Sequence, residues 1–158
     1  MSTENRIGLD SDKTNKLADK LNILLANYSV FYQNTRGYHW NIKGDSFFVL
    51  HEKFEELYDD LKLKIDEVAE RVLTLGYTPN HKYSKYVEVS EISESDKVSD
   101  GKAAVNEILD AFKVILKIQR EILELSGEAE DEGTNALMSD YISEQEKLVW
   151  MYASYVNK

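Results

Sequence analysis

The amino-acid sequence predicts an all-α protein: a four-helix bundle with one long crossover that carries a short helix. The 158-residue chain contains one proline and seven glycines, which favours long helices over a turn-rich β fold. Apolar residues recur every three or four positions along four stretches, as expected for one buried face of a helix. Between the second and third stretches lies a connection too long for a simple turn between neighbouring helices.

The first two helices are predicted over residues 12–39 and 46–75. Ser11 or Asp12 could cap the start of the first, because short polar side chains accept hydrogen bonds from the free amides of a first turn. The pattern breaks around Gly44, where the chain turns into the second helix. Gly76 and the proline that follows end the second helix.

The other two helices are predicted over residues 100–125 and 134–155. The connection over residues 80–99 is expected to cross the bundle, with a short helix near 83–87. Two helices, a long connection and two more helices correspond to a four-helix bundle with a single crossover. The face of the last helix that is expected to point inward carries Leu137, Tyr141, Leu148, Met151 and Tyr155.

The chain length fits one domain over residues 1–158, with residues 1–11 expected to form a flexible tail. The polar, acidic N-terminus lacks the apolar core of a signal peptide. No apolar run approaches the roughly 20 residues that cross a membrane. We therefore expect a cytoplasmic protein without a membrane segment.

The net charge of −10 disfavours a general nucleic-acid-binding surface and suits a protein that attracts cations. The absence of cysteine excludes disulfides, thiolate metal sites and cysteine nucleophiles. Any metal site must therefore use imidazole and carboxylate ligands. That set suits iron, manganese or zinc, and the residue types alone do not choose between them.

Three histidines are available for such a site. His39 ends the first helix, His51 lies in the first turns of the second, and His81 is expected to be a solvated loop residue. Taken alone, a histidine on an apolar face is more often a hydrogen-bonded core residue than a ligand. Glu55 strengthens the metal reading, because it follows His51 by four residues and shares its helix face.

A second acidic pair has the same spacing. Asp66 and Glu70 point within roughly 60–100° of His51 around the helix axis, and they border its apolar stripe. In so acidic a chain, each carboxylate alone would be read as part of a solvated face. Acids beside a core stripe are more often paired, metal-bound or at an interface.

Distance prevents one chain from using all these residues at one ion. His51 and Asp66 are separated by about 22 Å along one helix, whereas the ligands of one ion lie about 2–2.5 Å from it. Two copies packed antiparallel about a two-fold axis near Asp59 would place His51 of one beside Asp66 and Glu70 of the other. Such a dimer carries two equivalent sites.

These residues resemble the signature of the Dps-type mini-ferritins, the DNA-binding proteins from starved cells, within the ferritin-like superfamily. The resemblance covers nearly the whole chain. Four segments agree with it in residue type and spacing: 39–44 (HWNIKG), 51–55 (HEKFE), 66–71 (DEVAER) and 147–151 (KLVWM).

The resemblance implies a ferritin-like subunit in a hollow dodecamer, with iron at the two-fold interfaces. His39, His51 and Glu55 would come from one subunit, and Asp66 and Glu70 from its mate, as both metal ligands and catalytic residues. Relatives usually carry aspartate where this chain has Glu55, so the longer side chain puts direct ligation there in question.

The activity implied is a ferroxidase and iron-storage function that protects against oxidative damage. Fe(II) would be oxidised preferably by hydrogen peroxide, or more slowly by oxygen, and Fe(III) mineralised inside the shell. Trp40 beside the site could quench radical by-products, or could simply be a buried aromatic residue at a helix end. Asp131 and Glu132 match acids that line entry pores in relatives, although an acidic solvated loop is an equal reading of them.

Two other functions stay open. A DNA-compacting shell with secondary iron chemistry is the first, but relatives that bind DNA use basic tails, and residues 1–12 contain Glu4, Asp10 and Asp12 against Arg6 alone. Little counterion release would then drive DNA binding, so we expect it to be weak. The second alternative is a plain helical oligomer in which His39 and His51 are structural.

Overall fold

The computed structural model describes residues 3–157 of the chain. This part contains five helices and no named strand. This confirms the all-α prediction. Four helices extend beyond the predicted bounds. Helix α1 does so by one residue at its start and two at its end, α3 by two at its end, α4 by three at its end, and α5 by two at its start. The helices are α1 (Ser11–Asn41), α2 (Phe47–Thr74), α3 (Tyr83–Val89), α4 (Gly101–Glu128) and α5 (Glu132–Tyr155).

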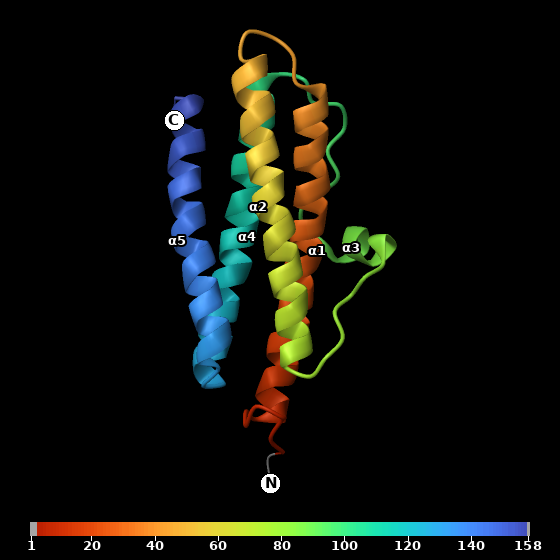
Figure 1. Ribbon diagram of the computed structural model, residues 1–158, viewed down its shortest axis with the longest axis vertical. Helices are drawn as coiled ribbons and strands as arrows, with labels where there is room; N and C mark the ends of the chain where they lie inside the picture. The colour runs from red at the N-terminus through yellow and green to blue at the C-terminus, as the bar shows by residue number, and fades with distance from the viewer. Residues whose placement is uncertain (1–2, 158) are drawn as a thin grey trace.

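The four long helices lie side by side, and the crossover runs along the outside of the bundle (Figure 1). The chain ascends α1 and descends α2. The crossover then returns it to the end of the bundle where α2 began, and from there it descends α4 and ascends α5. The crossover therefore makes α2 and α4 parallel. Helix α1 packs against α2, α4 and α3, and α4 packs against α5. None of the helices within residues 3–157 has the length and apolar character needed to span a membrane.

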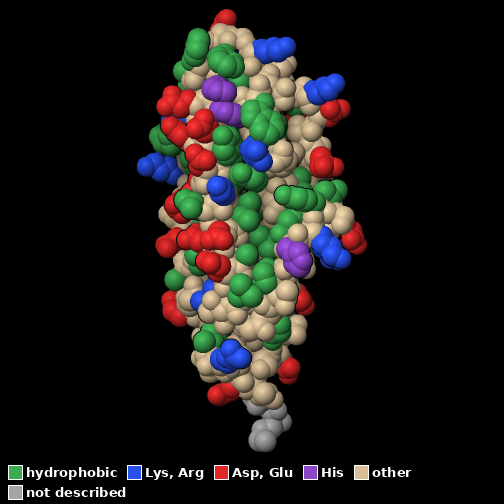
Figure 2. All heavy atoms as spheres, turned by 45° about the vertical axis from the view of Figure 1, so that its right-hand side comes forward, with side chains coloured by type: hydrophobic (Ala, Val, Ile, Leu, Met, Phe, Trp, Pro, Cys, Tyr) green, Lys and Arg blue, Asp and Glu red, His purple; other side chains and the backbone are tan. Residues whose placement is uncertain are grey.

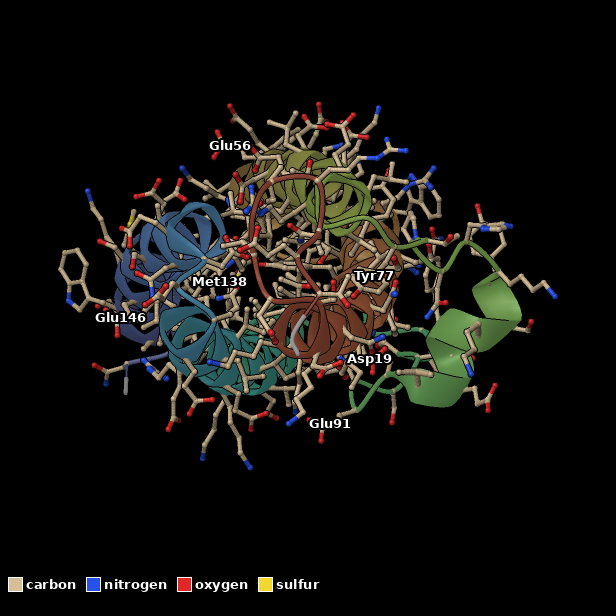
Figure 3. All side chains as sticks on the ribbon, turned by 90° about the horizontal axis from the view of Figure 1, so that it is seen from below. Asp19, Glu56, Tyr77, Glu91, Met138 and Glu146 are labelled. Carbon is tan, nitrogen blue, oxygen red and sulfur yellow. The ribbon has the colours of Figure 1, made fainter. Side chains whose placement is uncertain are left out.

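The core is built from the apolar stripes of the long helices. The rings of Phe31 on α1 and Phe112 on α4 meet edge to face, 5.1 Å apart, and both are fully buried. Seen along the bundle axis, Met138 points in among the helices, whereas Glu56 and Glu146 point outward and α3 stands apart (Figure 3). Burial of each large apolar side chain contributes about 1.5–3 kcal/mol, so this core supplies the main stabilisation.

Helix α5 presents part of the predicted face to the core: Tyr141 is buried, and Leu137 and Leu148 are half-buried and pack against the core. Its buried residues are Thr134, Met138, Tyr141 and Gln145, while Met151 and Tyr155 are exposed. The prediction was wrong for those two because a buried glutamine occupies a core position. An apolar pattern alone therefore selected a face that is rotated towards the outside of the bundle.

The N-terminal residues form a closed turn where we expected a flexible tail. The side-chain oxygen of Asn5 accepts from the amides of Ile7 and Leu9, and the Ser11 amide donates to the Thr3 carbonyl. The N-cap of α1 is Asp10, and neither Ser11 nor Asp12 takes that place. The cap prediction was therefore wrong, whereas the flexibility of residues 1–11 stays a prediction, and Met1 and Ser2 lie outside the described residues.

Asparagines on α1 hold the crossover in place. Asn22 bonds both the Thr78 carbonyl and the Asn80 amide. Fully buried Asn27 accepts from the amides of residues 91 and 92. Asn34 donates to the carbonyl of residue 93 and accepts from the amide of residue 95. Helix α1 therefore binds the crossover mainly through the backbone groups of the crossover. The expected short helix α3 lies against α1, and none of its own residues is buried.

Candidate metal centre

The turn between α1 and α2 brings His39 and His51 into contact. Gly44 adopts a φ of +107°, which a side chain would disfavour, and the Lys43 amide donates to the Ser99 carbonyl at 2.9 Å. The last turn of α1 therefore lies beside the first turns of α2. The two imidazole rings stack with centroids 3.7 Å apart and planes inclined by 13°.

Reciprocal hydrogen bonds fix both rings. Nδ1 of His39 lies 2.6 Å from the His51 carbonyl oxygen, and Nδ1 of His51 lies 2.8 Å from the His39 carbonyl oxygen. A carbonyl can only accept, so each Nδ1 carries its proton. In the neutral imidazoles each Nε2 then keeps a free lone pair. A histidine that donates from one nitrogen and offers the other is prepared to bind a metal ion.

Glu55 joins this pair from the next turn of α2. Its Oε1 lies 3.7 Å from Nε2 of His39, and its side chain is 54% exposed. The open side of the imidazole therefore faces a carboxylate. Two acceptors that face one another in this way are brought together most favourably by a cation between them.

Aromatic rings enclose the imidazole pair on both sides. Phe47 stacks on His51, with centroids 4.9 Å apart, and Tyr58 packs its ring against His39 at 5.3 Å and 80°. Burial, followed by the nearby charges of Glu55 and Asp59, raises the pKa of Tyr58 above its ordinary value. The phenol is therefore protonated at neutral pH.

Asp66 and Glu70 lie on the same helix but away from the imidazoles. Both are exposed, and α2 is continuous from Phe47 to Thr74. The separation of about 22 Å between His51 and Asp66 therefore holds. Within residues 3–157 of the single chain, no group of three or more His, Asp or Glu side chains could hold a metal ion.

The centre of the bundle offers no alternative iron site. Ferritin-like di-iron centres in bundle cores use inward-pointing carboxylates and a Glu-x-x-His motif, which this sequence lacks. Three buried polar side chains at the centre of the bundle, Tyr28, Gln119 and Gln145, bond to one another. Among residues 3–157 the only buried carboxylate is Asp131.

Asp131 has a structural role that the sequence did not reveal. Its carboxylate accepts from the Arg71 guanidinium at 2.7 Å and caps α5 through the Thr134 amide. It is 2% exposed, so the solvated-loop reading was wrong for this residue. Glu132, by contrast, is exposed in the first turn of α5.

Two other predicted residues are also exposed. Trp40 is 57% exposed, with the Arg36 guanidinium 4.9 Å from its ring centroid, so it is not a buried aromatic residue. His81 lies on the surface of the crossover, as expected. Figure 2 shows the imidazole-bearing face, with acidic side chains on one flank and hydrophobic side chains along its middle.

Sequence reasoning missed the residues that enclose the imidazole pair. Phe47 precedes His51 by four residues, and Tyr58 follows it by seven. Both spacings put the rings on the face of α2 that carries His51, and this signal could have identified them. The reciprocal bonds to backbone carbonyls had no comparable signal, because they depend on how two helix ends meet.

Comparison with known proteins identifies the fold. The sequence profile of the ferritin-like domain matches residues 18–158. A Dps protein from Vibrio cholerae O1, described as a member of a broad superfamily of ferritin-like diiron-carboxylate proteins, has a crystal structure that aligns with a TM-score of 0.96. Its sequence is 57% identical, and the alignment covers 99% of this chain and 98% of that one. The fold and the profile together define a ferritin-like protein.

Two further relatives identify the family to which the chain belongs among the ferritin-like proteins. The DNA protection during starvation protein of Porphyromonas gingivalis is 46% identical over 112 residues, which cover 71% of this chain and 70% of the relative. The structure of a Dps protein from Bacillus brevis aligns with a TM-score of 0.89 and 32% identity, over 92% of this chain and 97% of that one. The chain belongs to the Dps family of ferritin-like proteins. This membership supports a general role in iron binding and storage.

Proposed function

We propose that this protein is a ferroxidase and iron-storage mini-ferritin whose iron sites form between two subunits. The observation that carries the proposal is the pair of imidazoles locked by each other's backbone carbonyls, with both Nε2 lone pairs free. A structural histidine would use both nitrogens within the fold. This arrangement favours the metal-binding reading over a plain helical oligomer.

Glu55 fits the same proposal in spite of its extra methylene. Two ligands of one metal ion, each about 2.0–2.2 Å from it, lie about 3.0–3.8 Å apart. The 3.7 Å between the Glu55 carboxylate and Nε2 of His39 falls in this range. This distance supports direct ligation by the longer side chain of Glu55. Most of it is exposed, so it can adjust to an incoming ion.

The remaining ligands would come from the two-fold mate. One chain supplies two imidazoles and one carboxylate at one end of α2, and two exposed carboxylates, Asp66 and Glu70, near the other end. Antiparallel pairing of α2 with its copy would complete two equivalent sites. The lack of a three-residue cluster within the described part of one chain supports this assignment.

Fe(II) is the substrate of the proposed reaction. Two Fe(II) ions give one electron each to hydrogen peroxide, and with two protons the peroxide becomes two water molecules. Imidazole and carboxylate ligands suit both oxidation states of iron. Oxygen would be a slower oxidant. Fe(III) would then hydrolyse and mineralise in the cavity of a dodecameric shell, which removes Fe(II) and peroxide together and so limits oxidative damage.

The two predicted pore residues, Asp131 and Glu132, are not equally suited to an entry route for iron. We keep Glu132 as a candidate pore residue, because it is exposed at the start of α5. Asp131 is a weaker candidate, since both of its oxygens are engaged within the chain, by Arg71 and Thr134. An exposed ring of Glu132 side chains at a three-fold axis could still attract Fe(II) to the shell.

DNA compaction does not gain support as the main role. Relatives carry names that refer to DNA protection. In this chain, however, residues 3–10 form a closed turn, and its only cationic side chain is that of Arg6. We therefore keep the prediction that DNA binding is weak.

Subunit mixing tests the proposed site. One variant carries His39→Ala and His51→Ala, and a second carries Asp66→Ala and Glu70→Ala. Each alone lacks part of every site and should oxidise Fe(II) with peroxide hardly at all. Co-expressed, the two types should form mixed dimers in which one site has lost all four ligands and the other is intact. About a quarter of wild-type activity should return if pairing is random.

A matched control uses the same first variant co-expressed with a His81→Ala subunit. Its mixed dimers also retain one intact site, and the His81→Ala dimers retain two, so activity should be higher than in the first mixture. If co-expression of the two inactive variants restores no activity, although native mass spectrometry shows mixed dimers, the site does not lie between subunits. Wild-type protein that oxidises no Fe(II) would refute the ferroxidase proposal itself.

A further inference from the structure

We propose that Tyr58 is a one-electron donor beside the iron site, which completes the reduction of peroxide when only one Fe(II) is bound. This inference rests on the proposed function, because it assumes that His39 binds iron. The tyrosine would then protect the shell from the hydroxyl radical that a single Fe(II) would otherwise produce.

Contact geometry places Tyr58 next to the reaction. Its ring packs edge to face on His39, 5.3 Å from centroid to centroid. His39 would bind iron through Nε2, so one imidazole separates the phenol from the metal. Electron transfer between rings in van der Waals contact requires no movement of the chain. The half-buried phenol makes no hydrogen bond to another described residue, and its hydroxyl is not sealed in the core, so its proton can pass to the peroxide, directly or through water.

Local charge favours Tyr58 over the other aromatic residues nearby. Tyr58 follows Glu55 by three residues and precedes Asp59 by one on α2, and negative charge nearby makes removal of an electron easier. The Arg36 guanidinium lies over the rings of both Tyr32 and Trp40, at 5.5 and 4.9 Å. That cation makes both rings harder to oxidise, and it acts less strongly on Tyr58 than Glu55 and Asp59 do. A radical formed by electron loss from Tyr58 should therefore remain on that residue.

Trp40 is the less suitable donor for a second reason. It follows His39 in the sequence, but its ring is 57% exposed and stacks with Arg36. Among the aromatic contacts of the described residues, the rings that touch His39 are those of His51 and Tyr58. A radical on Trp40 would also face solvent, where it could react with other molecules.

The proposed step balances atoms and electrons. Fe(II) gives one electron to hydrogen peroxide and Tyr58 gives the second, so the O–O bond breaks to yield one water and one hydroxide. Fe(III) and a neutral tyrosyl radical remain, because the phenolic proton joins one oxygen of the peroxide. A second Fe(II) then returns one electron to the radical, which takes up a proton and becomes tyrosine again.

The experiment uses the assembled protein with one Fe(II) per proposed site and one equivalent of hydrogen peroxide. Samples frozen within milliseconds are measured by electron paramagnetic resonance. Wild-type protein should give a tyrosyl signal that decays when a second equivalent of Fe(II) is added. Tyr58→Phe should lose at least about nine-tenths of this signal and form more hydroxyl radical, measured by spin trapping.

Tyr32→Phe is the matched control. Tyr32 touches Tyr58, with centroids 6.0 Å apart, but it has no ring contact with His39 among the described residues. It should keep the wild-type signal. Both variants retain the aromatic ring, so packing is preserved, and with two Fe(II) per site Tyr32→Phe should oxidise iron at near the wild-type rate. Anaerobic titration should show that Tyr58→Phe still binds Fe(II) at the site, which separates loss of electron donation from loss of the iron site.

Three results would overturn the inference. The first is an equal tyrosyl signal in Tyr58→Phe. The second is a wild-type protein that oxidises the single Fe(II) without any protein radical. The third is loss of the signal in Tyr32→Phe with retention in Tyr58→Phe. If wild-type protein oxidises no Fe(II) at either iron ratio, the proposed function fails and this inference fails with it, which distinguishes the two failures.

Discussion

Two groups of polar side chains in this protein are held by reciprocal hydrogen bonds, and they differ in whether hydrogen-bonding atoms remain free. In the core, Tyr28 donates to Gln119, Gln119 donates to Gln145 at 2.7 Å, and Gln145 donates back to Tyr28 at 2.7 Å. At the end of the bundle, His39 and His51 donate to each other's backbone carbonyls. The core ring is closed, whereas the imidazole pair leaves two nitrogens free.

The difference separates a structural polar group from a binding one. Burial of an unpaired amide or hydroxyl costs about 1–3 kcal/mol, so the core ring is stable only because each member satisfies the next. The imidazole pair lies near the surface beside an exposed glutamate, where water can satisfy the free nitrogens until a cation arrives. Counting hydrogen bonds is therefore less informative than asking which lone pairs remain.

The largest expected effect is on activity at the open pair. His51→Ala should reduce the rate of Fe(II) oxidation by more than about 100-fold, since even second-shell partners of metal ligands are often worth about 10–100-fold. Stopped-flow absorbance measures the rate, and His81→Ala should leave it unchanged. If a His51→Ala protein oxidises iron at the wild-type rate, the imidazole pair does not bind the iron that is oxidised.

The next effect is on stability at the closed ring. Gln145→Leu leaves the amide of Gln119 without its acceptor and the Tyr28 oxygen without its donor. At about 1–3 kcal/mol for each of these two groups, the free energy of unfolding should fall by about 2–6 kcal/mol. Urea unfolding at one fixed protein concentration measures this, because subunit association also contributes to stability. Iron oxidation per folded subunit should stay near wild type.

A rescue variant sharpens the same test. Tyr28→Phe, Gln119→Met and Gln145→Met together remove all three polar groups while roughly preserving their shapes. Since loss of all partners together can be nearly neutral, this variant should lie within about 1 kcal/mol of wild type. If it is as unstable as the single Gln145→Leu variant, packing at these positions matters more than hydrogen bonding.

The smallest expected effect concerns alkaline pH. Burial raises the pKa of Tyr28 well above its ordinary value, so the folded state keeps a proton that the unfolded state loses above about pH 10. The stability that this proton contributes is complete below pH 10 and declines as pH rises towards the folded-state pKa. In urea titrations between pH 9 and 11, Tyr28→Phe should lose stability less steeply than wild type. Equal slopes would mean that other tyrosines dominate.

Sequence reasoning recovered those features that repeat along a helix. The long helices, the crossover and its short helix followed from apolar spacing and from the connection length. The separation of His51 from Asp66 followed from helix rise alone. The features that it missed involve contacts between helices. Gln145 was absent from the predicted inner face of the last helix because its two partners lie on other helices, and Asp131 could be read as a solvated loop acid because Arg71 is far away in sequence.

The candidate site shows the same boundary. His51 and Glu55 could be paired from their spacing, because both lie on one helix face. The contact of His39 with His51 needed the resemblance to known proteins, since it depends on how the chain turns at Gly44. The buried position of Asp131 could not be predicted, and it reduced the case for one of the two pore residues.

The asparagines of α1 have a consequence for how the sequence can vary. Asn22, Asn27 and Asn34 bond to peptide carbonyls and amides of the crossover. Every residue type supplies the carbonyl, and every type except proline supplies the amide. The path of the crossover is thus encoded largely on α1, at a distance from the segment that follows it. We expect the crossover side chains to tolerate change more freely than its length, because a lost or inserted residue would shift the peptide groups away from these amides.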